Sequence, residues 1–235
     1  MYGVDDAGVA LVQLDRPESR NAINTAMLGQ LLANLDAARE HEAAKVLVIS
    51  STDHMGLSAG ADVREDLDRD GLVHRLELFA RLYDELTGFA RPTVAACHGS
   101  CIGGGAEIAV ACDLRVGGSN LRIRFPGAAL GLPVGAARLV TLCGLSVAKY
   151  MLLTSREVGA DEALRWGLVH KVVPAARTEE AALALAAGVA SNPPQATARL
   201  KSMLHEWDRV EERSHEEGRR HVEWLRSGGR LPDPG

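Results

Sequence analysis

The chain of 235 residues carries a formal net charge of −5, with 46% hydrophobic, 24% charged and 4% aromatic residues. This length and balance are typical of a globular protein that buries a core, while the acidic charge and the few aromatic residues argue against a nucleic-acid partner. Four cysteines without a C-x-x-C pair predict neither a metal site nor a disulfide framework. The sequence shows no signal-peptide pattern and no apolar run of membrane-spanning length, which predicts a cytoplasmic protein without membrane contact.

Short apolar runs alternate with helical patterns along the first hundred residues. Buried strands are expected at 8–15, 45–50 and 93–97. Two helices separate them: the first carries leucines on one face and is capped by Asn24 or Thr25, and the second ends near Gly88. The order strand, helix, strand, helix, strand predicts an α/β architecture with helices covering a sheet.

The second half of the chain is mostly helical. Short strands are expected near 114–116, 121–125 and 168–173, and a short helix near 136–143. A long charged helical stretch follows over 195–226, and its apolar members Leu200, Met203, Leu204 and Trp207 recur at helical spacing. We expect these four side chains to be buried, partly against a neighbouring subunit.

Three consecutive glycines, Gly103–Gly105, stand where a strand is followed by a helix whose only charge before Asp113 is Glu107. The first N–H groups of a helix have no partners, and a missing Cβ lets a ligand approach them. Such a place suits a phosphate or an oxygen that gains negative charge during a reaction. No dinucleotide fingerprint, P-loop or nucleophile elbow is present. Two interpretations therefore stand: an oxyanion site, or glycines that only permit close helix–sheet packing.

A second stretch of small residues, SAGADVRE, lies at 58–65, and a helix is expected to begin there at Asp62 or Val63. This is another strand–loop–helix junction with free N–H groups. Two such junctions on neighbouring strands can each supply one donor to a single oxygen, which favours the oxyanion interpretation.

Together, the SAGAD stretch and the later GGGAEIAVACD stretch closely resemble the enoyl-CoA hydratase/isomerase family, the crotonase superfamily. Further segments at 16–24, 131–133 and 161–169 carry the resemblance, which runs from about residue 8 to about residue 200. It implies an α/β fold. A crotonase-like spiral of β-β-α turns over 1–175 would hold a CoA thioester site, and 176–235 would form a C-terminal helical trimerisation region.

The resemblance also implies the ligand and its contacts. Family members hold the carbonyl oxygen of a CoA thioester with two backbone N–H groups, which here belong to Ala61 and Gly104. Coenzyme A enters as part of the substrate, no cofactor is tightly bound, and the subunits form a homotrimer or hexamer. The substrate and CoA contacts implied are Ala22, Ile23, Ala59, Gly60, Ala61, Asp62, Val63, Arg64 and Gly104.

The chain departs from the family pattern at one catalytic position. Family hydratases use two glutamates; the first is Glu107 here, and the second position holds Gly127. Hydration needs a base for water and an acid for Cα, so Glu107 either does both or shares the work. For the other polar residues near these segments the sequence favours structural roles: Asp62 as a helix cap, His98 as a core histidine, Cys101 as a small buried residue, Asp113 as a paired carboxylate and Arg124 as a surface residue.

We therefore expect an acyl-CoA-processing enzyme of the enoyl-CoA hydratase/isomerase type. It would stabilise a thioester enolate with two N–H donors and move protons through Glu107. The alternatives left open are a catalytically weak acyl-CoA-binding protein, an acyl-CoA hydrolase or decarboxylase, and a structural subunit that assembles with an active relative.

Overall fold

The computed structural model describes residues 1–132 and 135–230. Its strands are β1 (Tyr2–Val4), β2 (Val9–Leu14), β3 (Val46–Ser51), β4 (Gly56–Ser58), β5 (Thr93–Cys97), β6 (Ser100–Ile102), β7 (Leu114–Gly118), β8 (Arg122–Arg124), β9 (Glu157–Gly159) and β10 (Lys171–Val173). Its α-helices are α1 (Thr25–Glu40), α2 (Arg69–Thr87), α3 (Gly104–Ala111), α4 (Ala136–Thr154), α5 (Ala160–Arg165), α6 (Thr178–Ala190), α7 (Pro194–Asp208) and α8 (Val210–Arg226).

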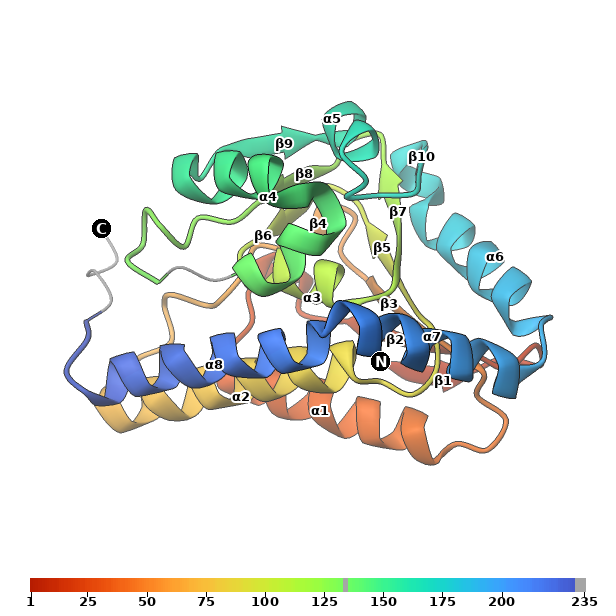
Figure 1. Ribbon diagram of the computed structural model, residues 1–235, viewed down its shortest axis with the longest axis horizontal. Helices are drawn as coiled ribbons and strands as arrows, with labels where there is room; N and C mark the ends of the chain where they lie inside the picture. The colour runs from red at the N-terminus through yellow and green to blue at the C-terminus, as the bar shows by residue number, and fades with distance from the viewer. Residues whose placement is uncertain (133–134, 231–235) are drawn as a thin grey trace.

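The strands form two sheets (Figure 1). The larger has the order β1-β2-β3-β5-β7-β10 and the smaller the order β4-β6-β8-β9. Neighbouring strands are parallel, except that β1 is antiparallel to β2 and β9 is antiparallel to β8.

Three successive β-β-α turns build the centre of the molecule: β3-β4-α2, β5-β6-α3 and β7-β8-α4. In each turn the first strand joins the larger sheet, the second joins the smaller sheet, and a helix follows. The prediction of an α/β spiral of β-β-α turns is therefore confirmed. The parallel pairing also brings the ends of β4 and β6 to one edge of the smaller sheet.

Both faces of the larger sheet are buried, which explains the continuous apolar runs of its strands. Successive residues of β3 alternate between two hydrophobic clusters: Leu47 and Ile49 join the cluster that contains α1 and α3, while Val46 and Val48 join the cluster that contains α6. The sheet thus separates α6 from α3, and α3 lies inside the larger of the two clusters.

Most expected elements are present, with differences at their ends. Asn24 caps α1 by accepting a hydrogen bond from the Met27 N–H (2.9 Å), and Gly88 is the C-cap of α2, as predicted. The long stretch 195–226 is two helices, because Arg209 takes a left-handed backbone conformation (φ 56°) between α7 and α8. The four apolar residues of α7 remain exposed within the single chain.

Helix α4 is longer than the short helix expected at 136–143. It also contradicts the expectation that the chain has no apolar run long enough to span a membrane. By length and composition alone it is apolar enough to cross a membrane. Its backbone, however, breaks at Gly144 (φ 76°, ψ 158°), which leaves two short helical pieces. The first piece carries Arg138, a buried charge that is bonded to other helices of the fold.

Candidate active site

The two small-residue segments meet at the shared end of β4 and β6. A Cβ atom added to Gly60 would lie 3.5 Å from the backbone nitrogen of Gly104. Ala61 is bridged to Ile23, because the Ile23 N–H donates to the Gly60 carbonyl (2.7 Å) and the Asp62 N–H donates to the Ile23 carbonyl (2.9 Å). That pairing leaves the N–H of Ala61 directed away from the bridge.

The two N–H groups expected to form an oxyanion hole are both free of internal partners. Within residues 1–132 and 135–230, neither the Ala61 N–H nor the Gly104 N–H donates a hydrogen bond to another residue. Gly104 is the first residue of α3, so its N–H also points out of the positive end of a helix. Two unpaired donors on adjacent segments are suited to one shared acceptor.

The neighbouring glycines serve the backbone and the packing. Gly103 has φ 48° and ψ −116°, a conformation that other residues avoid. A Cβ on Gly105 would lie 2.7 Å from the Cβ of Ser58, so a side chain there would push α3 off β4. The packing interpretation is therefore correct for Gly105, while Gly104 presents the free N–H.

The expectation of a helix starting at Asp62 or Val63 is wrong. Residues 62–65 form a turn, and α2 begins at Arg69 with Asp68 as its cap. The Asp62 carboxylate instead accepts the Arg64 N–H (3.0 Å) and pairs with Arg16 (2.5 Å), whose guanidinium holds the pKa of Asp62 below its usual range. The Ala61 donor consequently has no helix behind it.

The implied substrate contacts lie along the Ile23–Ala61 bridge. Ala59, Ala61, Val63 and Arg64 are exposed, Ala22 and Gly104 are half-buried, and Ile23, Gly60 and Asp62 are buried. The segment thus presents a strip of small residues beside one apolar and one cationic side chain.

Glu107 lies in the first turn of α3, as predicted, and is fully buried. Its Oε2 atom accepts a hydrogen bond from an Arg138 nitrogen at 2.6 Å. Its Oε1 atom has no partner among the described residues, and a Cβ added to Gly135 would lie 2.7 Å from it. Burial raises the pKa of Glu107 to about 7, with Arg138 opposing the rise and Glu217 adding to it. Near neutral pH this carboxyl group can both take and give a proton.

Arg138, from α4, links Glu107 to the C-terminal helix. Its guanidinium donates to the Ser214 hydroxyl (2.6 Å) and to Glu217 (3.1 Å), both on α8, and lies 5.1 Å from the centre of the Tyr83 ring on α2. Arg138 is not among the residues expected from the sequence to form the site, although a charge inside an apolar helix is a signal of such a role. Glu217 carried no signal, because it lies in a helix of many charges.

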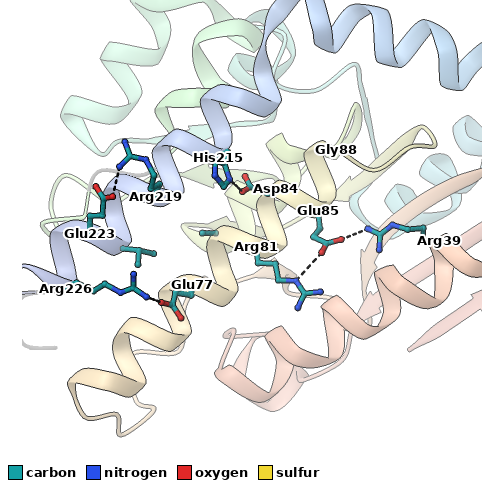
Figure 2. A pocket seen from close by; sticks show the side chains of 13 residues that line it. Arg39, Glu77, Arg81, Asp84, Glu85, Gly88, His215, Arg219, Glu223 and Arg226 are labelled. Atoms are coloured by element: carbon teal, nitrogen blue, oxygen red, sulfur yellow. Dashed lines mark hydrogen bonds and ion pairs between the residues drawn. The ribbon is translucent and has the colours of Figure 1, made fainter.

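Helix α8 is fixed alongside α2 (Figure 1). A surface groove of about 690 Å³ lies between these two helices and α1. Figure 2 shows the side chains that line it, among them the pairs Arg226–Glu77 and His215–Asp84. The His215–Asp84 distance is 3.0 Å. The Ser214 hydroxyl, which accepts a hydrogen bond from Arg138, itself donates one to Asp84 (2.9 Å). Paired charges therefore line the groove. The pairs between α2 and α8 hold α8 in place, and α8 carries the Ser214 and Glu217 side chains that contact Arg138.

Gly127, at the second glutamate position, is buried and begins a turn after β8 whose next residues, 128–131, are exposed. Its carbonyl accepts hydrogen bonds from the N–H groups of Leu130 (3.1 Å) and Leu132 (2.9 Å). The preceding residue, Pro126, lies 3.8 Å from the position of a Cβ added to Gly103. The turn therefore runs past the glycine segment without a carboxylate. Pro133 of the matching family segment lies outside the described residues.

The other polar candidates have structural partners. His98 bonds the Asp53 carbonyl through Nε2 (2.8 Å), as a core histidine. Asp113 accepts hydrogen bonds from Thr93 and pairs with Lys201 (2.8 Å) and His205 (3.2 Å), so its structural role is confirmed.

The remaining two candidates, Cys101 and Arg124, also have structural contacts inside the fold. Cys101 is fully buried, as expected, and its contact with Cys97 together with burial raises the pKa of its thiol. Arg124 is half-buried rather than on the surface, because its Nε donates to the Ser155 carbonyl at 2.6 Å.

Comparisons with known proteins identify the family. The family model described as enoyl-CoA hydratase/isomerase matches residues 5–223. A 2,3-dehydroadipyl-CoA hydratase of Escherichia coli (strain K12) is 36% identical over 205 residues, which cover 86% of this chain and 80% of the relative. A short-chain-enoyl-CoA hydratase of Clostridium acetobutylicum is 31% identical over 202 residues, covering 84% of this chain and 77% of the relative.

Solved structures show the same architecture. An enoyl-CoA hydratase from Bacillus anthracis superposes with a TM-score of 0.82 at 28% identity, over 92% of this chain and 90% of that one. For an enoyl-CoA hydratase/isomerase from Xanthobacter autotrophicus Py2 the TM-score is 0.88 at 24% identity, over 99% of this chain and 88% of that one, which supports the fold. The spiral fold, the paired glycine segments and these matches together show that the chain belongs to the enoyl-CoA hydratase/isomerase (crotonase) family.

Proposed function

We propose that the protein acts on an acyl-CoA thioester through an enolate, with the N–H groups of Ala61 and Gly104 as oxyanion donors and Glu107 as the proton-transfer group. One observation carries the proposal. A buried carboxyl group with a pKa raised to about 7 lies in the first turn of the helix whose free N–H adjoins a second free N–H.

The chemistry follows from this arrangement. When the thioester oxygen gains negative charge, two preorganised donors stabilise it, and each such donor typically contributes about 10²–10³ in rate. Glu107, held by Arg138, then removes or delivers a proton at Cα, or activates a water molecule. Coenzyme A is part of the substrate, and the exposed strip from Ala59 to Arg64 would contact it.

Hydration or double-bond isomerisation is the generic reaction of such a site, and relatives named as hydratases support it. Gly127 favours a second candidate, an acyl-CoA-binding protein with weak catalysis, because one of the two family carboxylates is missing. We further propose that the active form is a homotrimer or a hexamer.

The first test is a panel of CoA thioesters, screened for turnover by mass spectrometry and for binding by calorimetry, with each free acid as the matched control. The thioesters are expected to bind more tightly than the acids, because the nucleotide and pantetheine supply much of the contact. Equal binding of acid and thioester, or no binding at all, would contradict the proposal.

The second test separates the two candidates through Gly127. The wild type is expected to hydrate crotonyl-CoA slowly, since the loss of one acid/base group typically costs about 10²–10⁴ in rate. Gly127→Glu is expected to raise that rate, while Gly127→Gln, of the same size but without the carboxylate, is not. Rapid hydration by the wild type would show that another residue supplies the second acid/base group.

A further inference from the structure

Tyr83 lies between the two halves of the candidate site. Its ring packs against Phe79 (5.8 Å between ring centres) and under the guanidinium of Arg138, which holds Glu107. Its hydroxyl reaches the start of α3, because a Cβ added to Gly104 would lie 3.3 Å from the Tyr83 oxygen. One side chain from α2 thus touches the surroundings of both the carboxylate and the proposed oxyanion donor.

The hydroxyl of Tyr83 has no hydrogen-bond partner in the part of the chain that the structure describes. The side chain as a whole is only 9% exposed, but its hydroxyl oxygen is not among the fully buried atoms that lack a partner, so a ligand or a water molecule can reach it. Phenylalanine would fill the same space, so packing explains the ring and leaves the hydroxyl unexplained. The N–H groups of Ala61 and Gly104 are unpartnered too, and three such donors indicate an acceptor atom that belongs to a ligand.

The protonation state of Tyr83 sets what its hydroxyl can do. Burial, and next the negative charge of Glu107, raise the pKa of Tyr83 well above its usual value. The phenol therefore keeps its proton at neutral pH and acts as a hydrogen-bond donor, whereas a base would need the ionised form.

A small internal cavity offers one rival explanation. It measures about 20 Å³ and is lined by Tyr83, Arg138, Ser214 and Glu217 among others, which is enough room and polarity for one water molecule. If that water were the partner of the hydroxyl, Tyr83 would have no contact with a substrate.

We propose that Tyr83 is a further catalytic residue whose hydroxyl donates a hydrogen bond to the thioester oxygen, beside the N–H groups of Ala61 and Gly104. The inference rests on the proposed function of the site. Tyr83 keeps its proton throughout, and Glu107 remains the group that transfers protons. The third donor offsets part of the loss at Gly127 by stabilising the enolate rather than by replacing the missing acid.

The test is Tyr83→Phe, which removes the hydroxyl and keeps the ring. Tyr150→Phe is the matched control, because Tyr150 is 50% exposed and its hydroxyl accepts a hydrogen bond from Arg156 (3.0 Å). Two quantities are measured: the rate of deuterium incorporation at Cα of butyryl-CoA in D₂O, and the red shift in absorbance of bound 4-dimethylaminocinnamoyl-CoA, which reports polarisation of its carbonyl group.

Tyr83→Phe is expected to lower the exchange rate about 10²-fold and to reduce the red shift, with little change in KM, while Tyr150→Phe behaves as the wild type. An unchanged rate and red shift in a folded Tyr83→Phe would overturn the inference and assign the hydroxyl to the internal water.

If Tyr83→Phe fails to fold, 3-fluorotyrosine at position 83 replaces it as the test, because it is a stronger donor of nearly the same shape. It should enlarge the red shift, and an unchanged red shift would overturn the inference. A wild type that neither binds butyryl-CoA nor exchanges its protons would overturn the proposed function itself, which distinguishes the two failures.

Discussion

At the scale of single residues, the site depends on the charge of one buried carboxylate. Burial favours the protonated form of Glu107, the Arg138 guanidinium favours the ionised form, and Glu217 disfavours it again. The charged and titratable groups that face Glu107 are Tyr83 from α2, Arg138 from α4 and Glu217 from α8. If the ionised carboxylate is the base, enolate formation should increase as the pH rises through about 7.

Replacement of Glu217 tests this balance. Glu217→Gln removes a negative charge that raises the pKa of Glu107, so that pKa should fall and the acidic limb of the pH–rate profile should move to lower pH. The profile is measured as deuterium exchange into butyryl-CoA. Glu216→Gln is the control, because the Glu216 side chain is 40% exposed and pairs with Arg219 and Arg220 rather than with Arg138. If the acidic limb of the Glu217→Gln profile stays in place or moves to higher pH, then Glu217 on α8 does not raise the pKa of Glu107.

The limits of sequence reasoning are clearest at this scale. The position of Glu107 could be predicted, because its glycine segment is local in sequence. The partner of its Oε2 atom could not, since Arg138 is 31 residues away and reaches it only through the packing of α4 on α3. The partner of Asp62 could not be predicted either. Its sequence position suggested a helix cap, but in the fold its carboxylate pairs with Arg16, 46 residues earlier.

At the scale of elements, α7 has two unlike faces. Lys201 and His205 on one face are tied to Asp113 at 2.8 Å and 3.2 Å. The hydrogen bond to Asp113 also raises the pKa of His205. The opposite face carries Leu200, Leu204 and Trp207, which are 56%, 51% and 71% exposed. An apolar stripe of this kind on an otherwise anchored helix is typical of a protein interface.

We therefore expect the protein to form trimers or hexamers through this face of α7. Trp207→Glu places a charge in the stripe and should shift the mass measured by light scattering toward the monomer. Ser202→Glu adds the same charge to an exposed position of α7 outside the stripe and should leave the mass unchanged. A wild type that remains monomeric at micromolar concentration would contradict the prediction.

At the scale of the whole molecule, the larger strands and helices follow from the sequence. The runs at 45–50 and 93–97 are buried on both faces, so their continuous hydrophobicity was informative. Of the smaller sheet, only β8 was expected, near 121–125; β4, β6 and β9 were not, because three residues are too few positions to show a pattern. Yet β4 and β6 bring the two N–H donors together. The two small-residue junctions suggested such a pair, and the family resemblance assigned it to Ala61 and Gly104.

The central claim is that Glu107 moves the proton at Cα of an acyl-CoA. The most direct measurement is deuterium incorporation into butyryl-CoA in D₂O, followed by mass spectrometry, for the wild type and for Glu107→Gln, with calorimetry to show that both bind the thioester. The account predicts exchange by the wild type, and binding without exchange by Glu107→Gln. Exchange by Glu107→Gln at the wild-type rate would contradict it.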